Sequence, residues 1–253
     1  MSRPSYALEN LTWPEVARIL ARDPRLIFPV GALEQHGPHL PLGSSTLIAE
    51  RLCRDLSEDL GILLAPTLPY GVTLHGRGRF AGAATLRRKT LHKAVNELLS
   101  CWEDHGVREF VVVTAYRYEP HLDALLMALT ARSETTVIDV YAIDVSDLLE
   151  TPAESEHGGE LETSLMLHLA PERVRLDQIA DFVPEGGDVR RYMRHRMPTP
   201  PPQSRGAVGR PSRASAEKGR LIYERYRMAV RAALVRSAQR EDRAPGASVG
   251  GTS

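Results

Sequence analysis

The sequence predicts a three-layer α/β fold, in which helices flank a mostly parallel central sheet. Short apolar runs bounded by glycine or polar residues read as buried strands, and they alternate with segments whose apolar residues recur at helical spacing. The chain is 253 residues long, enough for one domain with a substantial core. Strands separated by helical segments of this length indicate βαβ units and a parallel sheet with helices on both faces.

Each element follows from its own pattern. The first strand ends at Gly31, and the following helix carries Leu52 and Leu56 on one face before it ends at Gly61. The segment EFVVVT is the clearest buried strand. The predicted strands are 26–30, 62–68, 109–114 and 136–143, and the predicted helices are 46–60, 90–105, 121–133, 160–169 and 215–238. We expect one domain over 1–238 and a disordered tail over 239–253.

Composition excludes several classes of protein. Lys and Arg number 32 and Asp and Glu number 32, a balance that argues against nucleic acid or an anionic membrane surface as a partner. No apolar run approaches the roughly 20 residues that a spanning helix needs. The first residues lack the pattern of an export signal, which favours a cytoplasmic location.

Chemistry is expected where the strands end, because ligands of parallel sheets bind outside the carboxyl ends of the strands. Glu34 and His36 follow the first strand and stand two residues apart, so in an extended segment their side chains leave on the same side. A carboxylate and an imidazole in one direction suit a divalent metal ion. A polar loop with capping roles is the alternative interpretation.

Three segments resemble the creatininase family of metal-dependent amidohydrolases. Residues 29–42 read PVGALEQHGPHLPL and resemble the family signature, and TLIAE at 46–50 continues it. EHGGELETS at 156–164 and the glycine-containing stretches at 206–211 and 214–219 resemble two later family segments. The resemblance covers about 8–238. It implies the α/β fold, a homo-hexamer, and hydrolysis of amide C–N bonds in small molecules or peptides by two divalent metals.

The resemblance also implies roles for single residues. Glu34 and His36 become ligands of different metals, Glu162 becomes a further ligand, and His157 becomes a proton-transfer group beside the scissile nitrogen.

The chain departs from the family pattern at the metals. Ser45 stands where the family has an aspartate that bridges both ions, and a neutral hydroxyl cannot replace two shared anionic oxygens. Tyr116 stands in place of a histidine ligand, or Arg117 does if the alignment shifts by one residue. We therefore expect no dinuclear centre. A single Zn, Mn or Fe ion on His36 and Glu162, with Glu34 as a weaker ligand, or no ion at all, is the expectation.

The altered positions suggest a repurposed site. Arginine and tyrosine can bind a carboxylate and donate protons without a metal. The predicted catalytic residues are therefore His157, Glu34, Tyr116, Arg117 and Glu119. The predicted substrate-binding residues are Arg77, Ser45 and Tyr118.

Three functions remain open at this point. The first is an enzyme that acts on an amide, a lactam or a related C–N bond with one metal or none. It would hydrolyse this bond in a small molecule or form it in a biosynthetic pathway. The second is a non-catalytic subunit that binds a small molecule or a partner protein. The third is an ordinary two-metal hydrolase. A homo-oligomer is expected in each case.

Overall fold

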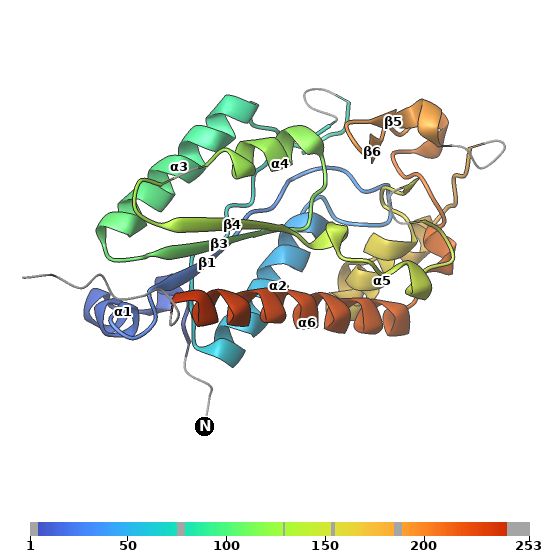
Figure 1. The fold of residues 1–253 in the computed structure, drawn as a ribbon. Helices are drawn as coiled ribbons and strands as arrows, with labels where there is room; N and C mark the ends of the chain where they lie inside the picture. Colours follow the sequence, from blue (N-terminus) through green and yellow to red (C-terminus); the bar gives the residue numbers. More distant parts are fainter. Residues whose placement is uncertain (1–4, 75–78, 129, 153–154, 185–188, 242–253) are drawn as a thin grey trace, which may run out of the picture.

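Four parallel strands form one sheet in the order β2–β1–β3–β4 (Figure 1). The structure is a computed structural model that describes residues 5–74, 79–128, 130–152, 155–184 and 189–241. The sheet strands are β1 (Arg25–Pro29), β2 (Leu63–Leu64), β3 (Glu109–Thr114) and β4 (Glu134–Asp139). A separate antiparallel hairpin consists of β5 (Met193–Arg194) and β6 (Met197–Pro198).

Both faces of the sheet are covered by helices, which confirms the predicted three-layer fold. On β3, Phe110 and Val112 pack to one face and Val111 and Val113 to the other. The first face is covered by α1 (Trp13–Leu20), α3 (Arg88–Asp104) and α4 (Glu119–Leu126). The second is covered by α2 (Ser44–Leu60), α5 (Glu160–Leu169) and α6 (Ala216–Glu241). A strand buried on both sides reads as a continuous apolar run, which is why β3 was the clearest prediction.

Two predicted strands are shorter in the structure, for local reasons. The second was expected over 62–68, but the continuous ladder ends at Leu64, since Pro66 has no N–H to donate. Pairing resumes only as an isolated bridge between Val30 and Leu68. The fourth was expected over 136–143 and ends at Asp139, whose side chain accepts the Tyr141 N–H and turns the chain.

The helices differ from prediction mainly at their ends. Helix α4, which was predicted over 121–133, ends at Leu126. Helix α6 continues to Glu241, three residues past the expected end of the domain. Helix α1 was not predicted, although Thr12 and Glu15 form a capping box at its start. None of the helices within the described ranges combines the length and apolar character that crossing a membrane requires.

The topology places one edge of the sheet at a switch point. The chain leaves β1 through α2 to β2 on one side, and leaves β3 through α4 to β4 on the other. The carboxyl ends of β1 and β3 therefore flank a crevice of the kind in which α/β proteins bind ligands.

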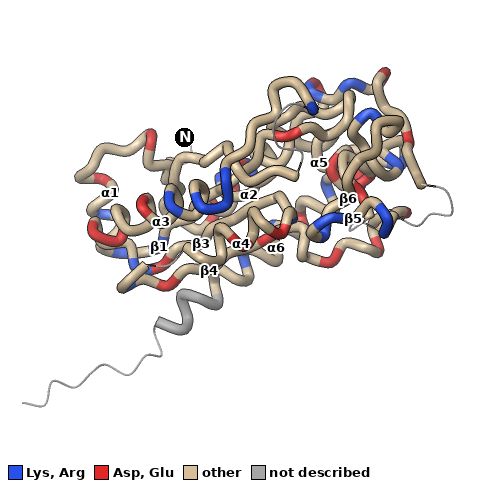
Figure 2. Tube along the Cα trace, turned by 90° about the horizontal axis from the view of Figure 1, so that it is seen from above, with Lys and Arg blue, Asp and Glu red and all other residues tan. Residues whose placement is uncertain are grey.

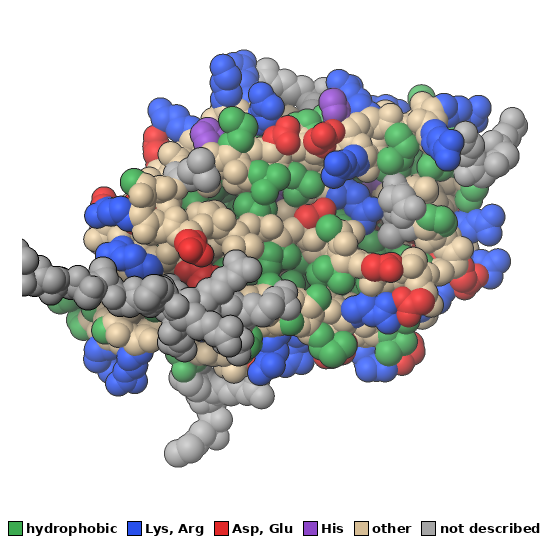
Figure 3. All heavy atoms as spheres, viewed as in Figure 1, with side chains coloured by type: hydrophobic (Ala, Val, Ile, Leu, Met, Phe, Trp, Pro, Cys, Tyr) green, Lys and Arg blue, Asp and Glu red, His purple; other side chains and the backbone are tan. Residues whose placement is uncertain are grey.

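Acidic and basic residues are interspersed along the described chain (Figure 2). On the face of the molecule that Figure 3 shows, apolar side chains gather across the middle, with charged side chains around them.

Candidate metal centre and active site

The loop after β1 carries Glu34 and His36 into this crevice. Gly31 starts the loop with its backbone against α2, where an added Cβ would lie 2.1 Å from Thr46 Oγ1. On the far side Gly158 also makes a close approach, since its Cβ would lie 2.7 Å from the His36 carbonyl oxygen. Glycine is required at both positions, and the two contacts fix the loop between α2 and the segment that carries His157.

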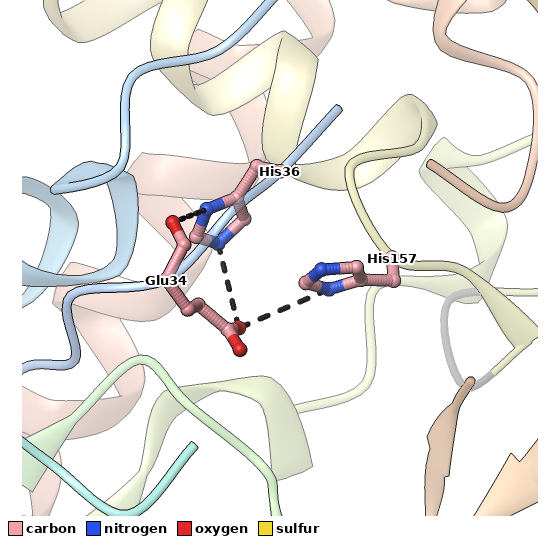
Figure 4. A group of neighbouring side chains, drawn as sticks. All are labelled: Glu34, His36 and His157. Carbon is pink, nitrogen blue, oxygen red and sulfur yellow. Dashed lines mark hydrogen bonds and ion pairs between the residues drawn. The ribbon is translucent and has the colours of Figure 1, made fainter. Parts of the chain in front are cut away.

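Three buried side chains point toward one another in the crevice (Figure 4). His36 Nε2 lies 3.9 Å from Glu34 Oε1, and His157 Nδ1 lies 4.0 Å from the same oxygen. One ligand atom from each of Glu34, His36 and His157 lies within 4.8 Å of the other two. All three residues are at most 1% exposed. We refer to these three residues as the centre.

Backbone carbonyls fix which ring nitrogens face the centre. His36 Nδ1 lies 3.2 Å from the carbonyl oxygen of Glu34, and His157 Nε2 lies 2.8 Å from that of Gln35. A carbonyl can only accept, so His36 Nδ1 carries the proton and the lone pair of the neutral ring lies on Nε2, the nitrogen that faces Glu34. His157 Nε2 contacts both the Gln35 carbonyl, which accepts, and the Gln35 side-chain amide, which donates, so these two contacts favour different tautomers of His157. Orientation of histidine by a carbonyl is typical of metal sites.

The Glu34 carboxylate is held by one oxygen and exposed to the centre by the other. Tyr116 donates its phenolic hydrogen to Glu34 Oε2 at 2.7 Å, and the same hydroxyl accepts the Leu74 N–H at 3.1 Å. Glu34 Oε1 is buried and has no hydrogen-bond partner among the described residues. A buried carboxylate oxygen without a partner is costly, so a positive ligand at this point would be strongly favoured.

Glu162 lies at the other side of His36. Its Oε1 is 3.5 Å from His36 Nε2 and 3.4 Å from the hydroxyl of Tyr141, while Oε2 accepts the Gly158 N–H. The start of α5 thus brings a second carboxylate to the centre, and its acidic first turn lies where the helix dipole favours negative charge.

The pKa values of Glu34, His36 and Glu162 are shifted by burial and by the charges of these groups on one another. Burial raises the pKa of Glu34 to about 8, against the opposing charge of His36. Burial alone would lower the pKa of His36, but the negative charge of Glu162 overrides it and raises the pKa to about 9. Glu162 is also buried, yet His36 holds its pKa far below the usual range. A divalent cation would displace the protons that Glu34 and His36 hold, since ligands bind metals in their deprotonated forms.

The donor set fits a single divalent ion. Two adjacent ligands of a tetrahedral zinc ion, each about 2.0 Å from the metal, lie about 3.3 Å apart. The separations of 3.5 Å, 3.9 Å and 4.0 Å in the centre are slightly wider, and small side-chain movements would close them. Carboxylates and imidazoles together suit zinc or manganese.

The two positions where the chain departs from the family pattern do not add ligands for a second ion. Ser45 Oγ lies 3.2 Å from His36 Nε2, so the serine faces the centre but brings no charge. Tyr116 is engaged as a donor to Glu34. Among the described residues, one group of three His, Cys, Asp or Glu side chains brings a ligand atom from each within 4.8 Å of the other two, and this group is the centre. Glu162 adjoins it through His36.

The other predicted site residues lie around the centre or away from it. Arg117 lies in the adjoining pocket, with its guanidinium over the ring of Tyr141. Tyr118 packs its ring against Tyr116 and is 7% exposed. Glu119 lies at the start of α4, partly exposed and 3.5 Å from His195, outside the centre. The prediction for Arg77 lies outside the described residues.

Two residues with a part in the site were not predicted. Gln35 connects the centre to a distant segment: its side-chain amide contacts His157 Nε2 at 2.9 Å and donates to the Gly206 carbonyl at 2.8 Å. Tyr141 reaches Glu162, as described above. The only signal for Tyr141 was its place after β4, at the carboxyl edge of the sheet.

A small pocket leads to the centre, with about 20 Å³ of free space, enough for one water molecule. Its polar wall includes His157 and Glu162, and its apolar wall includes Leu161 and Met197.

Comparison with known proteins agrees with the family resemblance. Residues 9–235 match the family model Creatininase, described as creatinine amidohydrolase. Creatinine amidohydrolase of Pseudomonas putida is 33% identical over 246 residues, which cover 87% of this chain and 92% of that protein. A mycofactocin precursor peptide peptidase of Mycobacterium tuberculosis is 28% identical, over 82% and 83% of the two chains. A solved manganese creatininase superposes with a TM-score of 0.77 at 27% identity, over 92% of this chain and 99% of that one.

Proposed function

Because this chain belongs to the creatininase family, we propose that it is a hydrolase of an amide or lactam C–N bond that works with a single divalent metal ion. The observation that carries the proposal is Glu34 Oε1, a buried oxygen that has no hydrogen-bond partner among the described residues and faces both imidazoles of the centre. Family members act on different molecules, as the names of the two relatives above show. Membership of the family therefore does not by itself identify the substrate.

Glu34, His36 and Glu162 would hold the ion. The two carboxylates bring negative charge, and His36 lies between them with its lone pair toward the centre. When bound, a divalent ion polarises a carbonyl and lowers the pKa of water near it. Glu162 is a weak proton acceptor because its carboxylate is stabilised by His36 and the Gly158 N–H, and it is therefore better suited to ligation than to proton transfer.

His157 would move the proton. Its Nδ1 faces the centre and can take a proton from an attacking water, and it can return that proton to the leaving nitrogen. In the tautomer whose Nε2 donates to the Gln35 carbonyl, Nδ1 carries the lone pair and is available as the acceptor. The geometry also allows His157 to act as a third ligand, and variants distinguish the two roles (Discussion).

A non-catalytic binding function is the competing proposal, favoured by Ser45 and Tyr116 at positions where the family pattern has ligands. Elemental analysis of the purified, dialysed protein separates the proposals. We expect one equivalent of metal per chain and hydrolysis of at least one member of a panel of lactams and amides, lost on chelation and restored by manganese or zinc. Chains that take up no metal and hydrolyse nothing would support the binding function, and two tightly held ions would contradict the single-ion centre.

A further inference from the structure

Within the part of the chain that the structure describes, Arg117 is a partly buried cation without a carboxylate partner. Its Nη2 donates to the Tyr141 carbonyl at 3.2 Å, and its guanidinium carbon lies 5.1 Å from the centroid of the Tyr141 ring. Among the described residues, no carboxylate oxygen lies within 4.0 Å of it. A guanidinium has five N–H donors, so most of its hydrogen-bonding capacity is unused in this position.

Other arginines of the chain are paired directly. Arg25 binds Asp23 through two nitrogens, and Arg225 binds Asp147 in the same way. Arg117 does interact electrostatically with Asp139, whose pKa is raised by burial, an effect that the charge of Arg117 only partly counteracts. Asp139 is itself occupied by the Tyr141 N–H. The guanidinium of Arg117 therefore has N–H donors available to bind another anion.

Tyr141 holds Arg117 at a fixed place relative to the centre. The face of its ring supports the guanidinium, and its hydroxyl reaches Glu162 Oε1 at 3.4 Å. One half-buried side chain thus spans from the cation to the carboxylate of Glu162. Arg117, Tyr141 and Glu162 also line the same pocket as His157. Arg117 is the only cationic side chain other than histidine among the residues that line it in the described structure.

We propose that Arg117 binds a carboxylate of the substrate, so that the substrate class is an amide or lactam that carries a carboxylate a few bonds from the reacting C–N bond. Arginine and carboxylate match in geometry and can form two parallel hydrogen bonds. The other acid of the pocket wall, Glu156, does not compete, since its oxygens accept the backbone N–H groups of Glu160 and Arg210. The identity of the reacting bond rests on the proposed function, whereas carboxylate binding does not.

Ligand binding tests the proposal without requiring turnover. The probes are the monoamides of malonic, succinic and glutaric acid, each compared with its neutral diamide, titrated into metal-loaded protein and followed by NMR. The three chain lengths cover different spacings between amide and carboxylate. We expect at least one monoamide to bind about tenfold more tightly than its diamide, the effect of a charge-assisted hydrogen bond.

Variants identify the residue responsible. Arg117→Met should remove the preference for the monoamide, and Arg117→Lys should retain part of it. Arg173→Met removes an exposed arginine elsewhere and should leave the preference intact. The proposal is overturned if no monoamide outcompetes its diamide or if the preference survives Arg117→Met, as it would if the carboxylate bound the metal. Failure of the proposed function would instead appear as missing metal or missing hydrolysis in the preceding experiments.

Discussion

Tyr116 and Glu34 are joined by a buried hydrogen bond of 2.7 Å, and this bond determines how Glu34 faces the centre. The phenol holds Oε2, so Oε1 remains directed at His36 and His157. By the family resemblance, Tyr116 or Arg117 stands where a histidine ligand is expected. In the structure Tyr116 instead orients the carboxylate of Glu34 by a hydrogen bond to the oxygen that faces away from the two histidines. Outer groups of this kind set the orientation and basicity of metal ligands.

Removal of this hydroxyl should weaken the metal site. We expect Tyr116→Phe to lower metal affinity by about 10–100-fold, because Glu34 loses its orienting donor. The free energy of unfolding should fall by about 1 kcal/mol as the Leu74 N–H loses its acceptor. Isothermal titration with manganese and urea unfolding measure the two effects. Tyr118→Phe is the matched control, and equal affinities in both variants would show that Tyr116 does not position Glu34.

Ser45 and Tyr116 together should determine the number of ions. The double variant Ser45→Asp, Tyr116→His supplies a second carboxylate and a second imidazole beside His36, so metal content should rise from one equivalent toward two. Ser44→Asp adds the same charge one residue away, where the serine hydroxyl bonds to the Pro41 carbonyl instead of facing the centre. A second ion in that control, or none in the double variant, would contradict the explanation.

The two histidines of the centre should differ in effect. His36→Ala should abolish metal binding, whereas His157→Ala should keep the ion and lower turnover by about 10²–10⁴-fold, the range for loss of a general acid–base group. Elemental analysis beside a hydrolysis assay on the best substrate of the panel measures both. If His157→Ala also loses the ion, His157 is a ligand and the proton must move by another group.

Acid should destabilise the protein through His121. Burial lowers the pKa of His121 from its ordinary value of 6.5 to about 3, since the ring is enclosed and its Nδ1 accepts the Val72 N–H. Below about pH 6.5 the imidazole of His121 is therefore protonated in the unfolded chain but still neutral in the folded chain. The free energy of unfolding falls as the pH drops from about 6.5 toward 3.

At pH 5.5 the loss of stability through His121 amounts to about 1 kcal/mol relative to neutral pH. Urea unfolding at pH 7.5 and 5.5 should show that His121→Gln, whatever its stability at neutral pH, loses less on acidification than the wild type by this amount. His105→Gln, on the surface, serves as control. The same acid loss in wild type and His121→Gln would assign the effect to other groups.

The sequence predicted what depends on local pattern. The strand ending before Gly31, the buried strand over 109–114 and the helix over 160–169 follow from apolar periodicity and breakers. The pairing of Glu34 with His36 follows from the two-residue repeat of an extended chain. The limits of the second strand and of the fourth helix were missed, because they depend on which backbone groups find partners in three dimensions.

By itself, the sequence determined the family and the three-layer fold, and it predicted departures from the family's ligand pattern at Ser45 and at Tyr116 or Arg117, since these are statements about residue type and order. Only the tertiary structure decided that Tyr116 supports Glu34, that Tyr141 joins Arg117 to Glu162, and that Gln35 holds His157 from 122 residues away. Such contacts join segments whose distance along the chain carries no information about their distance in space. They form only after burial of the sheet has brought the ends of its strands to one edge.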